Sequence, residues 1–146
     1  YGEPVLMGAS NILRIAVAII RDEDGHVLLV RKQGTSAFMQ PGGKIEDGEH
    51  AADALCRELA EELSMVVAPD ALIPIGHAVA PAANEPDTDV HAEIFEVRTI
   101  GALSIAAEIA EAQWVDPAAA GALELAPLSR DHILPLARRN NKVNLV

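Results

Sequence analysis

Three glutamates and an arginine within residues 57–62 are spaced so that they could bind a metal ion. This stretch lies inside Glu49–Leu63, which contains no Gly or Pro, so we predict a helix there. At about 100° per residue, Glu58, Glu61 and Glu62 fall within about 100° of one another, beside an apolar stripe. Like charges at these spacings repel, and a ligand set made only of oxygen atoms suits a hard divalent cation such as Mg²⁺ or Mn²⁺.

The same helix also admits a simpler interpretation. Acidic faces are common on protein surfaces, and Arg57 could pair with Asp53 and Glu61, four residues away on either side. Taken alone, the helix favours this surface interpretation. The preceding segment, Pro41-Gly42-Gly43-Lys44, changes the balance. Its glycines let a bound group approach the backbone, their carbonyls could complete a metal shell, and its lysine could contact phosphate, although the segment could also be a plain turn.

Together the loop and the helix resemble the signature of the Nudix hydrolase family. That signature is Gly, five residues, Glu, seven residues, Arg-Glu, a bulky aliphatic residue, any residue, Glu-Glu, any residue, Gly and an aliphatic residue. The chain matches it over residues 43–65 through Gly43, Glu49, Arg57, Glu58, Leu59, Glu61 and Glu62. Ser64 stands in place of the last glycine, and Met65 fits the final position loosely. A long pattern at fixed spacing is far more specific than a lone glycine motif, so we prefer the functional interpretation.

The resemblance implies a fold and an activity. The fold would be α/β, a Nudix-like α/β/α sandwich with a mixed β-sheet. The activity would be Mg²⁺- or Mn²⁺-dependent hydrolysis of a phosphoanhydride in a nucleoside diphosphate linked to another moiety. Residues 40–46 resemble those of members that sanitise nucleoside triphosphates, whereas Pro81, sixteen residues after Met65, is typical of members that cleave ADP-ribose. The substrate therefore stays open between a triphosphate and an ADP-ribose or nucleotide-sugar type.

Two alternatives to an enzyme are a Nudix-fold module that binds a nucleotide without cleaving it and an acidic interaction domain. Such a binding module would lack the signature acids, and all of them are present here. The expected partner is a small nucleotide. A homodimer is a further expectation, because many relatives of this family are dimers.

Carried over position by position, the resemblance gives the signature residues their expected roles. Glu58 and Glu62 would be the leading metal ligands, joined by Glu61 and the carbonyl of Gly42. Glu58 is also a candidate base for activating water, and Arg57 would orient a carboxylate by a charge-assisted hydrogen bond.

Residues around the signature receive supporting roles. Glu49, about 180° from Glu58 by helix phase, is expected to support Arg57 or the loop rather than share the metal. Glu108, six residues before Trp114, is expected to be an extra ligand or an alternative base, with an exposed loop carboxylate as an equal alternative. Contacts to the substrate are expected from Gly43, Arg31 and Lys44, with Lys32 as a further cation.

The surrounding sequence predicts the elements that must position these side chains. Apolar runs rich in Val and Ile indicate β-strands at residues 13–20, 27–30, 72–79, 90–99 and 113–115. The Asp22–Gly25 turn would join the first two strands as a hairpin. Pro41–Gly43 is expected to break regular structure as a tight loop. Short helices are expected at residues 116–123 and 130–140, the second interrupted near Pro135.

The length and the net charge of the chain limit the classes of protein to which it can belong. The 146 residues suit one domain, predicted over residues 12–146 after an irregular segment, residues 1–11, whose first residues could derive from an expression vector. The net charge of −11 argues against a nucleic-acid polymer or an anionic membrane as partner, and a phosphate substrate then needs cations between the charges. The single cysteine, Cys56, fits a reducing compartment, so we expect a cytoplasmic protein. Ile15–Ile20 is too short to span a membrane.

Overall fold

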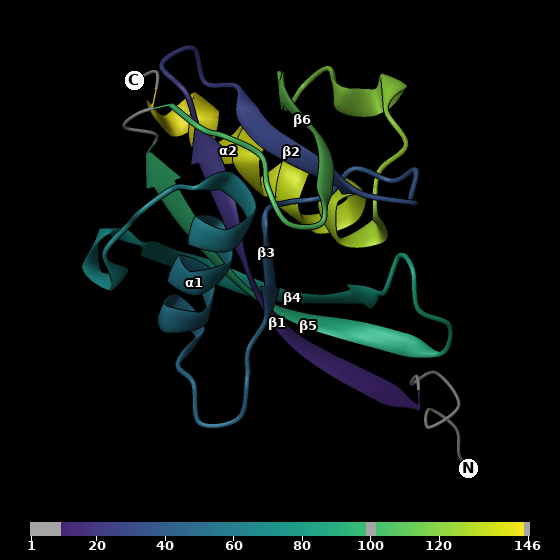
Figure 1. Ribbon diagram of the computed structural model, residues 1–146. Helices are drawn as coiled ribbons and strands as arrows, with labels where there is room; N and C mark the ends of the chain where they lie inside the picture. Colours follow the sequence, from purple (N-terminus) through teal and green to yellow (C-terminus); the bar gives the residue numbers. More distant parts are fainter. Residues whose placement is uncertain (1–9, 99–101, 145–146) are drawn as a thin grey trace.

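The centre of the fold is a mixed β-sheet of six strands (Figure 1). The computed structural model describes residues 10–98 and 102–144. Within this part of the chain the strands are Asn11–Arg21 (β1), Val27–Lys32 (β2), Gly42–Lys44 (β3), Ile73–Pro81 (β4), Thr88–Arg98 (β5) and Ile109–Val115 (β6). The sheet order is β4-β5-β1-β2-β6, with β3 paired to β1. β1 and β5 are parallel along their whole length, and the other pairs described are antiparallel.

One helix packs on each face of this sheet. α1 (Ala51–Leu63) covers one face and α2 (Leu134–Asn144) covers the other. The strand β1 supplies both cores because its side chains alternate between faces. Toward α1 it presents Ala16, Ala18 and Ile20. Toward α2 it presents Val17 and Ile19. The expected α/β/α arrangement with a mixed sheet is therefore confirmed. Among the helices of the described residues, none combines the length and the apolarity needed to cross a membrane.

The prediction of a tight loop at Pro41–Gly43 is wrong, because Gly42 and Gly43 begin the strand β3. Gly42 pairs with Val17 and has a φ of +144°. A Cβ atom at Gly42 would lie only 2.1 Å from the carbonyl oxygen of Ala16. Glycine therefore allows β3 to lie directly against β1. The strand is not recognisable in the sequence, because its glycines interrupt the apolar pattern.

Other predicted boundaries shift by a few residues. β1 begins at Asn11, inside the segment predicted to be irregular, and residues 1–9 of that segment lie outside the described residues. Residue 99, the predicted end of the fourth strand, also lies outside them. α1 begins two residues after Glu49, with His50 as its N-cap. The helix predicted at residues 116–123 is wrong, because the structure has a turn and a short 3₁₀ helix, Ala120–Ala122.

The C-terminal helix is irregular near Pro135, where the sequence predicts an interruption. A π-helical turn, Ser129–Ile133, leads directly into α2. Pro135 has no N–H to donate, and its ring would clash with the carbonyl four residues earlier in a regular α-helix. A wider turn before the proline relieves that clash. This turn also points the buried Ser129 hydroxyl at Gln40.

A buried ion pair ties the sheet to α2. The Nε of Arg21 donates to Oε2 of Glu96 at 2.9 Å, and a terminal nitrogen of Arg21 donates to the carbonyl of Ala137 at 3.0 Å. The two side chains are 1% and 10% exposed. Removing one partner leaves the other charge buried without its counter-charge, which is strongly destabilising.

Glu96→Leu is therefore expected to lower the free energy of unfolding by about 3–5 kcal/mol, measured by urea denaturation. The double variant Arg21→Met, Glu96→Leu is expected to recover part of this loss, because it removes both buried charges. A single variant with the urea midpoint of the unmodified protein would contradict the assigned role of the pair.

Candidate functional site

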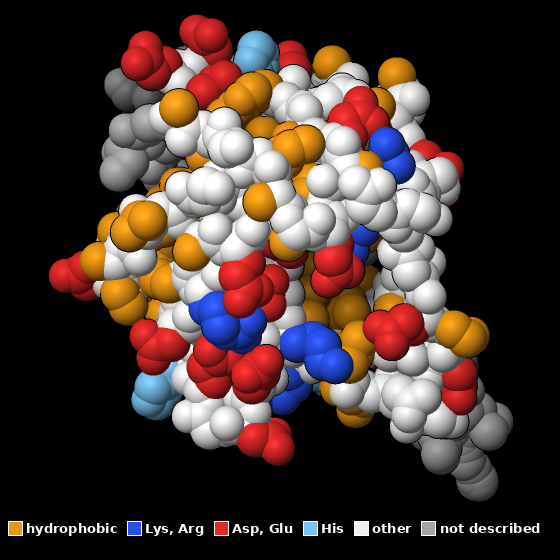
Figure 2. Space-filling view, viewed as in Figure 1, with side chains coloured by type: hydrophobic (Ala, Val, Ile, Leu, Met, Phe, Trp, Pro, Cys, Tyr) orange, Lys and Arg blue, Asp and Glu red, His pale blue; other side chains and the backbone are white. Residues whose placement is uncertain are grey.

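The three acids of α1 differ in burial. Glu62 is buried, and its Oε1 accepts a hydrogen bond from the backbone N–H of Gly42 at 3.2 Å. The side chain of Glu58 is 16% exposed, whereas that of Glu61 is 57% exposed. Acidic and basic side chains crowd together on this surface of the molecule (Figure 2). Glu58 and Glu62 therefore form a sheltered pair, with Glu61 on the solvent side.

Electrostatics make this pair of carboxylates unfavourable by itself. Burial raises the pKa of Glu62 to about 7; the charge of Glu58 adds to the rise, and the N–H of Gly42 opposes it. Burial also raises the pKa of Glu58, against the hydrogen bond from Arg57. A cation bound between two carboxylates that are shielded from water would stabilise their charged forms, because an opposite charge nearby favours ionisation. Their oxygen atoms are ligands that Mg²⁺ and Mn²⁺ accept, so the donor set fits a hard divalent ion.

Arg57 connects the acids to the loop before the helix. Its Nε and one terminal nitrogen donate to the two carboxylate oxygens of Glu49 at 3.0 and 2.9 Å. Its other terminal nitrogen donates to Oε2 of Glu58 at 2.8 Å. The carbonyl of Lys44 accepts a further bond at 3.1 Å. The hydrogen bond from Arg57 is the main cause that lowers the pKa of Glu49 to about 2. The guanidinium thus fixes the carboxylate of Glu58 from the side.

Gly43 lies against the same carboxylate from the strand β3. A Cβ atom at this position would lie 2.4 Å from Cδ of Glu58. The absence of a side chain at Gly43 therefore leaves the space that the Glu58 carboxylate occupies. Arg57 and β3 together leave that carboxylate little freedom to move.

α1 ends at the residue that departs from the signature. Ser64 adopts the left-handed conformation, with φ 55° and ψ 29°. Its N–H donates to the carbonyl of Ala60, and the N–H of Met65 donates to that of Leu59. The bond from Ser64 to Ala60 is the one that defines the αL helix cap, whose left-handed residue is usually a glycine. Serine thus closes the helix in the manner expected of a glycine.

Ser64→Gly is expected to stabilise the protein, because it removes the conflict between Cβ and the backbone in the left-handed region. The gain should be about 1 kcal/mol, visible as a higher urea midpoint with an unchanged slope. Ser104→Gly, at an exposed position in the loop before β6, is a suitable control and should bring no gain. A lower midpoint for Ser64→Gly would show that the hydroxyl contributes more than the backbone strain costs.

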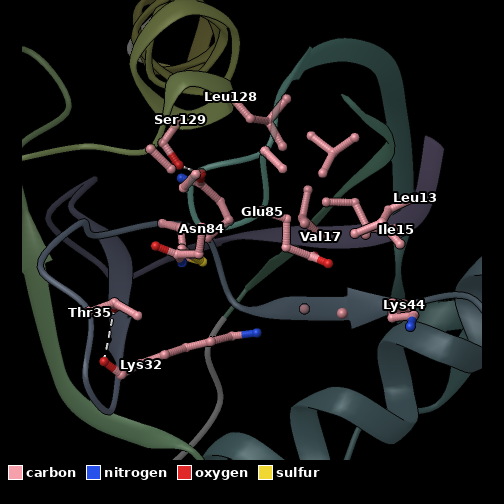
Figure 3. A pocket seen from close by; sticks show the side chains of 18 of the residues that line it. Leu13, Ile15, Val17, Lys32, Thr35, Lys44, Asn84, Glu85, Leu128 and Ser129 are labelled. Atoms are coloured by element: carbon pink, nitrogen blue, oxygen red, sulfur yellow. Dashed lines mark hydrogen bonds between the residues drawn. The ribbon is translucent and has the colours of Figure 1, made fainter. Parts of the chain in front are cut away.

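A cavity of about 320 Å³ includes Gly42 and Gly43 in its lining, whereas Glu58, Glu61 and Glu62 do not line it. Its apolar wall includes Leu13, Ile15 and Val17 of β1 and Leu128 before the π-helical turn. In Figure 3 these side chains lie on one side of β3, and Lys32 lies on the other. The remaining described lining includes Gly42, Gly43, Lys44, Glu108, Gln40, Ser129 and the loop from Pro81 to Glu85. The volume falls in the range of small-molecule sites.

The predicted substrate contacts are only partly brought together. Gly43 and Lys44 line the cavity, and so does Glu108, an exposed residue near enough to raise the pKa of Glu62. Arg31 does not line it. The guanidinium of Arg31 instead donates to Oε1 of Glu111 at 3.2 Å and to the carbonyl of Thr35 at 2.8 Å. Lys32, its neighbour in β2, lines the cavity, because successive strand residues point to opposite faces.

Two buried polar residues of the cavity were not predicted. Gln40 and Ser129 are 4% and 1% exposed, and the Ser129 hydroxyl donates to Oε1 of Gln40. They lie far apart in the sequence, so their pairing has no local signal. The sequence signal for this site is limited to a glutamine directly before Pro41-Gly42-Gly43.

A second cluster of possible metal ligands lies in the turn between β1 and β2. Ligand atoms of Asp22, Asp24 and His26 lie within 4.8 Å of one another. Oδ1 of Asp22 accepts from the backbone N–H groups of Asp24 and His26, each at 2.9 Å. These bonds are typical of an Asx turn, which accounts for the cluster as a structural feature.

Comparisons with known proteins agree with the signature and the fold. The family model of the NUDIX domain matches residues 12–137. An 8-oxo-dGTP diphosphatase from Haemophilus influenzae is 41% identical over 60 residues, which are 38% of this chain and 44% of that protein. The enzyme of the same name from Escherichia coli K12 is 40% identical over 57 residues, 36% of this chain and 44% of that protein. The matched stretch thus spans less than half the length of either relative.

The fold likeness extends much further than these alignments. The crystal structure of the MutT protein from Methanosarcina mazei Go1 matches with a TM-score of 0.71 at 22% identity, covering 90% of this chain and 96% of that one. With the NUDIX model matching most of its length and the signature residues gathered in one site, the chain belongs to the Nudix family.

Proposed function

We propose that the protein is a Mg²⁺-dependent pyrophosphohydrolase that removes pyrophosphate from a nucleoside triphosphate. The observation that carries this proposal is the sheltered pair of Glu58 and Glu62, held against the glycines of β3 beside a cavity of nucleotide-compatible size. The two relatives named above, both 8-oxo-dGTP diphosphatases, favour a triphosphate substrate over ADP-ribose or a nucleotide sugar.

In this proposal Glu58 and Glu62 would hold the cation, the carbonyl of Gly42 would serve as a backbone ligand, and the exposed Glu61 would join from the solvent side. A divalent ion bound there would neutralise phosphate charge and lower the pKa of a bound water. Arg57 keeps Glu58 in place through their 2.8 Å hydrogen bond, and Glu49 holds Arg57 in turn. Manganese could substitute for magnesium, since both accept carboxylate oxygens.

The cavity supplies the groups that would act on the phosphates. Lys32 and Lys44 line it and offer positive charge in a chain whose net charge is −11. Glu108 also lines it and lies on the loop just before β6. From there it would accept the proton of the attacking water as an alternative to Glu58, a role that requires only hydrogen-bond reach in the substrate complex. The step consumes one water and releases a nucleoside monophosphate and pyrophosphate.

A substrate panel tests the proposal. The panel contains the four dNTPs, 8-oxo-dGTP, ADP-ribose, a dinucleoside polyphosphate and a nucleotide sugar, each with Mg²⁺ and with EDTA. We expect a triphosphate to have the highest kcat/KM, with pyrophosphate as product and no turnover in EDTA. Faster cleavage of ADP-ribose than of any triphosphate would contradict the proposal. Stabilisation of the fold by Mg²⁺ and nucleotide without turnover would instead support a binding module.

A further inference from the structure

The amide of Gln40 is a buried polar group whose hydrogen bonding is incomplete. Its Oε1 accepts from the Ser129 hydroxyl. Within the described residues its Nε2 has no hydrogen-bond partner. The residue is 4% exposed, and a buried donor left without an acceptor costs about 1–3 kcal/mol. Gln40 lines the cavity, so a molecule bound there can supply the missing acceptor.

The position of this amide in the cavity indicates which part of a nucleotide it would contact. Gln40 directly precedes Pro41 and the β3 glycines, and Ser129 lies in the π-helical turn that leads into α2. Both line the cavity together with the apolar side chains Leu128 and Val17. The carboxylates Glu58 and Glu62 belong to α1, on the opposite face of the sheet. With the phosphates at the carboxylates, the flat apolar base would lie beside Gln40.

The bond from Ser129 determines what the amide can recognise. A free glutamine amide pairs with adenine by using both its oxygen and its nitrogen, whereas the corresponding edge of guanine offers two acceptors, O6 and N7. The Ser129 hydroxyl fixes the amide through one of the two lone pairs of Oε1, and among the described residues the part of the amide without a partner is Nε2 with its donor hydrogens. An unpartnered donor on Nε2 suits the 6-carbonyl of guanine, an acceptor, whereas at the 6-amino group of adenine it would face another donor.

We propose that Gln40, oriented by Ser129, is the specificity-determining residue of the cavity, and that it selects a 6-oxopurine over a 6-aminopurine by donating Nε2–H to the 6-carbonyl. The assignment of the phosphates to the α1 side rests on the function proposed above. Ser129 is a positioning residue, because its hydroxyl acts on the ligand only through the amide.

Binding of dGMP and dAMP tests the proposal without hydrolysis. Isothermal titration with Mg²⁺ is expected to show about tenfold tighter binding of dGMP than of dAMP by the unmodified protein. Gln40→Met, which keeps the length of the side chain without its amide, should reduce this preference to about twofold or less. Gln40→Glu, which offers only acceptors, should shift the preference toward dAMP. Gln113→Met is the matched control, because Gln113 bonds to Glu111 in β6 and does not line the cavity.

Ser129→Ala provides a second test should Gln40→Met fail to fold. Releasing Oε1 lets the amide present its oxygen as well as its nitrogen, so the preference for dGMP should fall while dAMP binding improves. If Ser129 had only a structural role, Ser129→Ala would weaken the binding of dGMP and of dAMP equally.

The remaining outcomes separate this inference from the proposed function. Equal binding of both monophosphates by the unmodified protein, no binding of either, or a preference that survives in Gln40→Met would overturn it. Turnover of dGTP and dATP in the same variants gives the second comparison. Hydrolysis with a ratio unaffected at Gln40 overturns the inference alone, whereas a Gln40-dependent binding preference without any hydrolysis overturns the proposed function alone.

Discussion

Glu58→Gln is expected to lower kcat/KM for the best substrate by about 10³-fold, the middle of the range for losing an acid–base group. The amide keeps the shape of the side chain but loses the charge that would hold a cation and accept a proton. It also replaces the ion pair with Arg57, whose hydrogen bond is now 2.8 Å long, with a weaker hydrogen bond in which only the guanidinium is charged. Steady-state hydrolysis of the best triphosphate with saturating Mg²⁺ measures the effect.

Asp53→Asn is the matched control for this variant. Asp53 is an exposed acid in the first turn of the same helix, so this change removes the same charge from α1 without touching the sheltered pair. Its cost should be limited to the weak interaction with the helix dipole, about 0.3–1 kcal/mol of stability, with activity retained. Activity within a few-fold of normal in Glu58→Gln would show that the assignment of Glu58 is wrong.

Gly43→Ala is expected to abolish most activity while the protein stays folded. The added methyl would lie 2.4 Å from Cδ of Glu58, so the carboxylate must move away from β3. Gly43 has no positive φ, so its backbone tolerates alanine. A displacement of about 1 Å at a reacting group can cost about 10²-fold in rate, and we expect a loss of at least that size in kcat/KM.

Gly42→Ala is expected to act on folding instead. Its methyl would meet the backbone of Ala16 at 2.1 Å, with φ at +144°, and backbone cannot yield as a side chain does. We expect this variant to unfold at a much lower urea concentration or to be insoluble. Gly121→Ala is the control for both, since nothing lies within 4 Å of the added methyl. Equal loss of stability in Gly42→Ala and Gly43→Ala would contradict this separation of roles.

The sequence predicts the chemistry of the site better than its geometry. Glu58, Glu61 and Glu62 were placed on one helical face because helix periodicity is local and regular. The expected support of Arg57 by Glu49 is present, since Arg57 bonds to both Glu49 and Glu58, but Glu49 lies before α1 begins, so helix phase is not the reason. The burial of each glutamate cannot be predicted from helix periodicity. Whether Glu61 or Glu62 is sheltered depends on β3, a strand that the glycines conceal.

Contacts between distant segments were beyond prediction. The parallel pairing of β1 with β5 and the hydrogen bond between Gln40 and Ser129 join residues separated by more than half of the chain. Neither leaves a periodic pattern in the sequence. Arg31 and Lys32 show the same limit on a smaller scale. Both are cations at the end of β2, where successive side chains point to opposite faces, and which of these faces borders the cavity depends on the packing of the whole sheet.

The partition formed by β3 gives this protein two regions that can change separately. Backbone and two glycines, rather than interlocking side chains, stand between the cavity wall and the carboxylates of α1. Among the described residues, Glu58 is hydrogen-bonded to Arg57 and Gln40 to Ser129, so a substitution at Gln40 or Leu128 removes no hydrogen bond of Glu58. An engineer could diversify the wall on the α2 side to accept new bases while leaving the cleavage machinery intact. The same separation would let a lineage of such proteins acquire new substrates without first losing activity.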